Sequence, residues 1–226
     1  MKKTAFIVLL GIIILIGCKK KSDDQTTPTI PVNNQSPMGN VGTTFAVNTS
    51  GVSNPIVEIT ALTNGISVVH ATGTVTDPVL LAALLSPTFH ESWATIDSSG
   101  NFVMNKNVKF TNQDITDYVN NDISRPFTVV NYSWNVGDST SAYIDKDAIK
   151  DSLITRKCIQ RSTTDDYYDP DLGMYIKTLT ITEQHKEYLL TYKANEKYGI
   201  VYGRLDYGTY YKEATILSSA QNNVSN

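Results

Sequence analysis

Short runs in which apolar and polar residues alternate fill the chain from about residue 45 onward, and a period of two predicts β-strands. Two pairs of such runs are separated by short turn sequences and predict hairpins: 55–62 with 66–75, and 93–97 with 101–110. Asn64-Gly65 joins the first pair, and both residues tolerate the positive φ that a tight hairpin turn requires. Further strand-like runs cover 127–134, 153–160, 175–183, 187–193, 198–205 and 210–217.

One segment breaks the β pattern and predicts a short helix. Asp77 is a good N-cap because its carboxylate can accept hydrogen bonds from the first free amides, and Pro78 suits the first helical position. Apolar residues fill 79–85, and Ser86-Pro87 ends the helix because the residue before a proline is pushed out of the α region. A helix this apolar needs cover on all sides, so we expect it to cap one end of the sheet.

Helical spacing also occurs in 112–121, where Ile115, Tyr118 and Val119 fall on one face, and we expect a second short helix there. The segment 145–153 fits either a third helix or an extended β-hairpin. About ten short, closely spaced strands predict a mainly β fold. The expected architecture is an antiparallel β-sandwich or a barrel-like sheet with one or two short helices.

The N-terminus carries the signature of an export signal. Lys2 and Lys3 precede twelve uncharged, mostly apolar residues over 6–17, and a helix of that length reaches only about 18 Å, short of the ~30 Å bilayer core. A cleaved signal peptide over 1–17 is therefore the stronger interpretation. The sequence Leu15-Ile16-Gly17-Cys18 resembles the lipobox of bacterial lipoproteins. That resemblance implies cleavage before Cys18, a lipid on its thiol and an acylated amino group; an ordinary signal peptide that ends in cysteine is the alternative.

The residues that follow the lipid acceptor Cys18 indicate the location of the protein in the cell envelope. Lys19 stands where inner-membrane lipoproteins of enterobacteria carry Asp, and 19–24 (KKKSDD) resembles the short signal that sends Bacteroidota lipoproteins to the cell surface. The resemblance implies an outer-membrane anchor facing the cell surface, with a periplasm-facing anchor as the alternative. Stretches at 134–138, 162–168 and 173–177 also resemble uncharacterised Bacteroidota lipoproteins, a likeness that implies an address and no chemistry.

Composition divides the exported chain into a tether and a domain. The segment 25–44 contains no charged or aromatic residue but several Pro and Gly, so it cannot bury enough apolar surface to offset the entropy of ordering it. We therefore expect a lipidated flexible tether over 18–44, part of which can join the sheet as an edge strand. A β-rich domain over 45–218 follows, with a division near 131–137 or none, and then a disordered tail over 219–226.

Charge and motifs exclude several function classes. The chain has 19 Lys+Arg against 22 Asp+Glu, and this absence of a basic surplus predicts no nucleic-acid partner. His70, His90 and His185 are isolated in sequence, so no zinc spacing or cofactor motif is present. Cys158, the one thiol left after lipidation, lies in a predicted strand that suits a small buried residue rather than a nucleophile.

An acidic loop and a tyrosine-rich region supply the remaining site candidates. Asp165, Asp166, Asp169 and Asp171 could offer oxygens to Ca²⁺, but Gly173 stands where a calcium loop needs a third Asp or Asn, and a solvated hairpin loop is preferred. Ten of the 13 tyrosines lie from 167 to 211. Aromatic rings on a sheet can stack on sugars, which makes Trp134, Tyr167 and Tyr168 ligand-binding candidates, whereas packing of the sheet is the simpler interpretation.

The sequence therefore predicts a lipid-anchored envelope protein with a binding or structural role, a glycan or a protein as partner, no cofactor and no catalytic activity. The alternative is an anchored hydrolase acting on glycan or peptide through scattered carboxylates, such as Asp165, Asp166 or Glu91, because such residues need no local motif.

Overall fold

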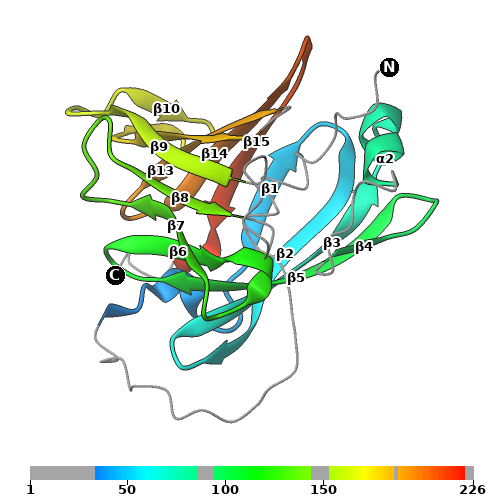
Figure 1. Cartoon of the computed structure of the whole chain (residues 1–226), viewed down its shortest axis with the longest axis horizontal. Coiled ribbons are helices and arrows are strands. Elements are labelled where there is room, and N and C mark those ends of the chain that lie inside the picture. The colour runs from blue at the N-terminus through cyan, green and yellow to red at the C-terminus, as the bar shows by residue number, and fades with distance from the viewer. Residues whose placement is uncertain (1–33, 86–93, 144–152, 186–187, 222–226) are drawn as a thin grey trace.

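The computed structural model describes residues 34–85, 94–143, 153–185 and 188–221 (Figure 1). The predicted signal peptide and Cys18 lie outside these residues, as do His90, Glu91 and most of the 145–153 segment.

Two antiparallel sheets make up the domain. The first has six strands in the order β2-β3-β5-β6-β7, with β4 also paired to β5. Its strands are β2 (Val52–Thr63), β3 (Ile66–Val75), β4 (Ala94–Ile96), β5 (Asn101–Phe110), β6 (Asp114–Tyr118) and β7 (Pro126–Asn131). The second sheet has seven strands in the order β1-β15-β14-β13-β12-β9-β8. Its strands are β1 (Phe45–Thr49), β8 (Ser139–Tyr143), β9 (Leu153–Arg161), β12 (Leu179–Gln184), β13 (Leu189–Asn195), β14 (Gly199–Tyr207) and β15 (Tyr210–Ser218).

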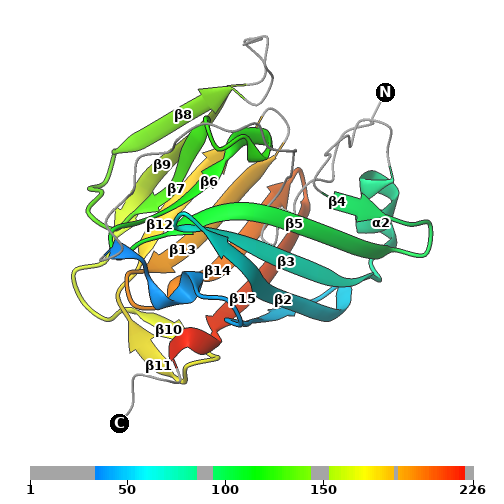
Figure 2. The same cartoon turned by 90° about the horizontal axis from the view of Figure 1, so that it is seen from below.

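The two sheets lie face to face and share one core (Figure 2). Val69, Met104 and Val129 of the first sheet and Cys158 and Ile181 of the second are fully buried in the same cluster. The chain passes from the first sheet to the second between β7 and β8, close to 131–137, where the sequence places a division or none. The sheets do not close into a barrel, so the predicted mainly β, sandwich-like fold is confirmed.

Smaller elements lie outside the two large sheets. A two-stranded hairpin pairs β10 (Tyr167–Asp169) with β11 (Met174–Ile176), and Figure 2 shows it at one end of the molecule. Single turns of 3₁₀ helix occur at η2 (Pro37–Gly39), η3 (Val119–Asn121) and η5 (Ser219–Gln221).

The last part of the predicted tether packs on the sandwich. Met38 is buried against the core, and the amide of Ile59 donates to the carbonyl of Thr43 at 2.8 Å. The chain thus lies along β2 before β1 crosses to pair with β15, so β1 joins the neighbouring edges of the two sheets. Residues 34–44, which the sequence assigns to the tether, therefore contact the folded domain.

Two local signals in the sequence are confirmed, a hairpin turn and a helix start. Asn64 and Gly65 both adopt positive φ, 53° and 76°, between β2 and β3. The helix α2 (Pro78–Leu84) begins as expected, because Asp77 Oδ1 accepts hydrogen bonds from the amides of Val79 and Leu80 at 2.9 and 3.0 Å. Its expected complete cover is wrong: Leu80 is buried, but Val79 is 53 % exposed.

The second expected helix is also wrong, because 112–121 forms β6 and η3. Ile115 pairs with Phe110 of β5 and with Val130 of β7, so β6 lies between two strands, and its residues 115–118 are all buried. Ile115, Tyr118 and Val119 are buried, as helical spacing would also require, but Asp117 between them is buried too. A strand with both faces covered loses the alternation by which strands are recognised.

Candidate functional site

A cleft of about 330 Å³ lies between the β9–β10 loop, the hairpin strand β11 and the turn from β13 to β14. Four stretches that are distant in sequence meet there: Tyr132 after β7, Arg161 at the end of β9, Tyr175 in β11 and the turn 195–198. Volumes in this range are typical of pockets for small ligands.

Tyr132 forms the buried part of the lining. The residue is 5 % exposed, and its hydroxyl has no hydrogen-bond partner among the residues that the structure describes. Burial, together with the negative charges of Asp114 and Glu196, raises the pKa of Tyr132 far above its usual range, so the phenol stays protonated. Buried polar groups in proteins nearly always have partners, so this hydroxyl has an unused capacity for a hydrogen bond.

Hydrogen bonds to the backbone hold the walls of the cleft in place. Arg161 Nη1 donates to the carbonyls of Tyr132 and Trp134 at 2.7 and 2.8 Å, which ties the end of β9 to the chain that leaves β7. On the other wall, Asn195 Oδ1 accepts from the amides of Lys197 and Tyr198, and Asn195 Nδ2 donates to the carbonyl of Lys177. The lining is therefore preformed.

The chemistry of the lining is mixed. Tyr175 presents an aromatic ring that is 59 % exposed, next to Met174, which is also exposed. The charged side chains of the lining are three cations and two carboxylates: Arg161, Lys177, Lys197, Asp165 and Glu196. Such a cleft offers an aromatic surface, hydrogen-bond donors and acceptors, and almost balanced charge.

The aromatic candidates from the sequence lie beside this cleft and not in it. Tyr168 stands edge-on to Tyr175, with ring centroids 5.3 Å apart, so it belongs to the exposed aromatic pair at the rim. Tyr167 is half-buried, with its ring 6.3 Å from that of Tyr202 and the ammonium of Lys193 over its face. Trp134 packs against the core and does not line the cleft; its carbonyl accepts from Arg161, which does.

The acidic candidates are separated by the fold. Asp165 lines the cleft, whereas Asp166 accepts a hydrogen bond from the hydroxyl of Ser162. Asp169 is buried; its Oδ1 accepts from the amides of Asp171 and Leu172, and its Oδ2 has no partner among the described residues. Within the described part of the chain no three acidic, His or Cys side chains are grouped for a metal ion. The hydrolase alternative stays a prediction.

The remaining candidates have structural surroundings. His70 shares a hydrogen bond of 2.9 Å with the side chain of Asn105, and Cys158 is fully buried in the core. Burial raises the pKa of the Cys158 thiol, which disfavours the thiolate that a nucleophile needs.

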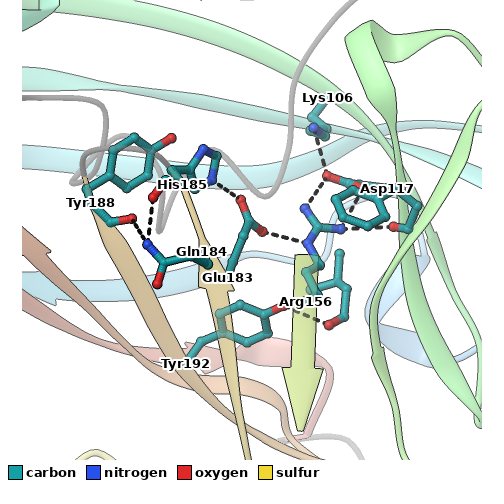
Figure 3. Close-up of polar contacts among 10 residues, drawn as sticks. Lys106, Asp117, Arg156, Glu183, Gln184, His185, Tyr188 and Tyr192 are labelled. Carbon is teal, nitrogen blue, oxygen red and sulfur yellow. Dashed lines mark hydrogen bonds and ion pairs between the residues drawn. The ribbon is translucent and has the colours of Figure 1, made fainter. Parts of the chain in front are cut away.

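The most highly charged part of the core is a chain of ion pairs between the two sheets (Figure 3). Arg156 of β9 is 4 % exposed and donates two hydrogen bonds to Asp117 of β6, at 2.9 and 3.2 Å. On its other side Arg156 Nε donates to Glu183 of β12 at 2.5 Å. Lys106 and His185 extend the chain at either end, at 3.0 Å from Asp117 and 2.5 Å from Glu183.

Further contacts surround the guanidinium. Arg156 Nη1 also donates to the carbonyl of Phe127 at 3.0 Å, and the guanidinium carbon lies 3.8 Å from the centroid of the Phe127 ring. Nearby, the hydroxyl of Tyr192 in β13 donates to the carbonyl of Val129 in β7 at 2.7 Å. Polar side chains of the second sheet thus bind the backbone of the first at two residues of β7, Phe127 and Val129.

The network holds both buried carboxylates in the ionised form. Burial by itself raises the pKa of Asp117, but the charges of Arg156 and Lys106 outweigh it and lower that pKa below the ordinary 3.8. Burial likewise opposes ionisation of Glu183, yet Arg156 and His185 lower its pKa well below 4.5. The same carboxylates raise the pKa of Arg156 against the effect of burial.

Sequence reasoning missed this network, although a signal was present. In β5 the inward positions run Phe102, Met104, Lys106 and Val108, so a charged residue falls in phase with the core. Arg156 stands two residues after Ile154 and two before Cys158 in the same way. Charged residues at core positions of several strands indicate buried ion pairs.

The first test replaces the central cation. Arg156→Met leaves Asp117 and Glu183 buried without their shared partner, and we expect a loss of about 3–5 kcal/mol in the free energy of unfolding. The matched control is Arg204→Met: Arg204 also pairs with two carboxylates, Asp206 and Glu213, but is 37 % exposed, so its loss should stay below about 1 kcal/mol. Urea unfolding measures both, and equal losses would contradict a buried inter-sheet role.

The second test measures how the stability of the fold depends on pH in the acid range. The pKa values of Asp117 and Glu183 are lower in the folded protein than in the unfolded chain. Their contribution to the free energy of unfolding is therefore full above about pH 5 and is lost as pH falls toward about 2. We expect Glu183→Gln to lower stability at neutral pH and to flatten the decline in unfolding free energy over that range. Asp206→Asn, at an exposed pair, is the control. If the unfolding free energy of Glu183→Gln declined with falling pH as steeply as that of the wild type, Glu183 would not be the source of the acid sensitivity.

Comparisons with known proteins find no matching family model, no matching curated protein and no matching solved structure. Among the described residues, no helix has the length and apolar character needed to cross a membrane. A function for this chain must therefore be argued from the chemistry of its own residues.

Proposed function

We propose that the protein is a lipid-anchored protein of the outer membrane, exposed at the cell surface, whose β-sandwich binds a saccharide or peptide ligand in the cleft lined by Tyr132, Arg161 and Tyr175. The N-terminal lipid holds the domain at the membrane, and the cleft supplies the recognition.

The lipobox-like sequence ending in Cys18 supports the anchor. One acyl chain gives only marginal membrane binding, whereas the two or three that a lipoprotein carries hold it firmly. A flexible chain as long as the predicted tether over 19–33 has an r.m.s. span of roughly 20 Å. That span is enough to keep the cleft clear of the lipid headgroups.

The observation that carries the binding role is the combination of a preformed polar cleft with an unpaired buried hydroxyl, that of Tyr132. Leaving a buried polar group unpaired costs about 1–3 kcal/mol, and a ligand that supplies a partner recovers part of that cost. The exposed ring of Tyr175 at the mouth adds an apolar contact surface of the kind that binding sites use.

The anchor is tested by Cys18→Ala. This variant should incorporate no labelled fatty acid and should leave the membrane fraction, because it lacks the apolar chains that supply the membrane affinity. The control is Cys158→Ala, which removes the other thiol but keeps the acceptor and should remain labelled. Wild-type protein that takes up no label and fractionates as soluble would overturn the anchored part of the proposal.

Binding is tested by thermal unfolding of the mature chain in detergent against a panel of oligosaccharides and short peptides. A ligand of the cleft should raise Tm in the wild type by mass action, lose that effect in Tyr175→Ala and keep it in Tyr211→Ala. Tyr211 is the matched control because it is a similarly exposed tyrosine of the same domain that does not line the cleft. If no panel member raises Tm in a Tyr175-dependent way, the binding role fails.

A further inference from the structure

We infer that the ligand of this cleft is a neutral, hydroxyl-rich saccharide. The inference rests on the proposed binding function and goes further by choosing one ligand class. Three features of the lining carry it: the balance of charge, the exposed aromatic face and the buried phenol.

The charges of the cleft disfavour an ionic ligand. Arg161, Lys177 and Lys197 are opposed by Asp165 and Glu196 in the same lining. An anion would meet two carboxylates, and a cation would meet three positive groups. Each hydroxyl of a sugar both donates and accepts, so a saccharide can satisfy ammonium, guanidinium and carboxylate groups in turn without bringing a charge of its own.

The aromatic face has the exposure that a sugar ring needs. Tyr175 is 59 % exposed, and Tyr168 stands edge-on beside it. A pyranose ring presents a face of C–H groups, whose partial positive charge suits the electron-rich face of a phenol. Met174, the preceding residue of β11, points to the opposite face of that strand and also lines the cleft, whose other side chains are mostly polar. An apolar platform bordered by donors and acceptors matches the two kinds of surface that one sugar carries.

Tyr132 explains why a hydroxyl ligand is preferred over a purely apolar one. Its phenol stays protonated and has no partner among the described residues, so it is able both to donate and to accept. The hydroxyl is covered by neighbouring atoms, so a hydrogen bond to a ligand requires the side chains above it to move aside. A sugar hydroxyl can complete this hydrogen bond, whereas a hydrocarbon group cannot.

The inference is tested by calorimetric titration of the mature chain in detergent at physiological salt. The probes are neutral oligosaccharides built from glucose, mannose, galactose or xylose, with oligogalacturonate and chitosan oligosaccharides as the anionic and cationic counterparts. At least one neutral probe should bind, and its affinity should fall about tenfold or more in Tyr175→Ala through loss of the stacking surface. Tyr211→Ala should bind as the wild type does.

Tyr132→Phe distinguishes a contact of the phenol with the ligand from a contribution of the phenol to the stability of the fold. The affinity for the neutral probe should fall about fivefold, the effect of one lost hydrogen bond, while the unliganded Tm stays the same or rises because an unpaired buried hydroxyl has been removed. A Tm loss in the unliganded variant together with unchanged affinity would overturn the role of the phenol.

The outcomes distinguish the two levels of the proposal. Binding of a peptide in the cleft without binding of any neutral saccharide overturns the saccharide inference and leaves the binding function intact. Binding confined to the charged oligosaccharides also overturns the inference. Absence of Tyr175-dependent binding by every probe and every peptide removes the proposed function itself.

Discussion

The buried guanidinium of Arg156 is the constraint on which the arrangement of the two sheets depends. A charge in the core is tolerated only when its partners are fixed around it, and Arg156 takes those partners from both sheets: Asp117 and the Phe127 carbonyl from one, Glu183 from the other. Arg156 and Glu183 are also cross-strand neighbours in the register of β9 and β12. Sliding one sheet over the other would break the bonds from Arg156 to Asp117 and to the Phe127 carbonyl, and would leave ionised groups in an apolar interior. The network therefore selects one packing of the sandwich.

The cleft inherits its geometry from the same strand. Arg161 ends β9, five residues after Arg156, and binds the carbonyls of Tyr132 and Trp134 in the chain that leaves β7. Strand β9 is thus attached to the first sheet in its middle and at its end. Tyr132 follows the first sheet, whereas Tyr175 and the turn 195–198 belong to the second half of the chain. The cleft forms only when the two sheets hold their relative positions.

Local chemistry made part of the fold predictable from the sequence. Asn64-Gly65 and Asp77-Pro78 specify a turn and a helix start through φ preferences and capping that need no tertiary context. The helix expected over 112–121 is wrong because Asp117, a polar residue in the sequence pattern, is buried by ion pairs that come from β5 and β9. The cleft could not be predicted, since it joins four stretches with no common motif, and the aromatic candidates Tyr168 and Trp134 only border it.

The central physical claim is that Arg156 makes the two sheets a single cooperative unit, and native-state hydrogen exchange tests it most directly. The buried amides of β6 in one sheet and of β12 in the other should exchange through the same global opening, with free energies that agree within about 1 kcal/mol. The slope of the exchange free energy against denaturant concentration should also be the same for both strands. Exchange of β12 through an opening well below the global free energy, while β6 stays protected, would contradict the account.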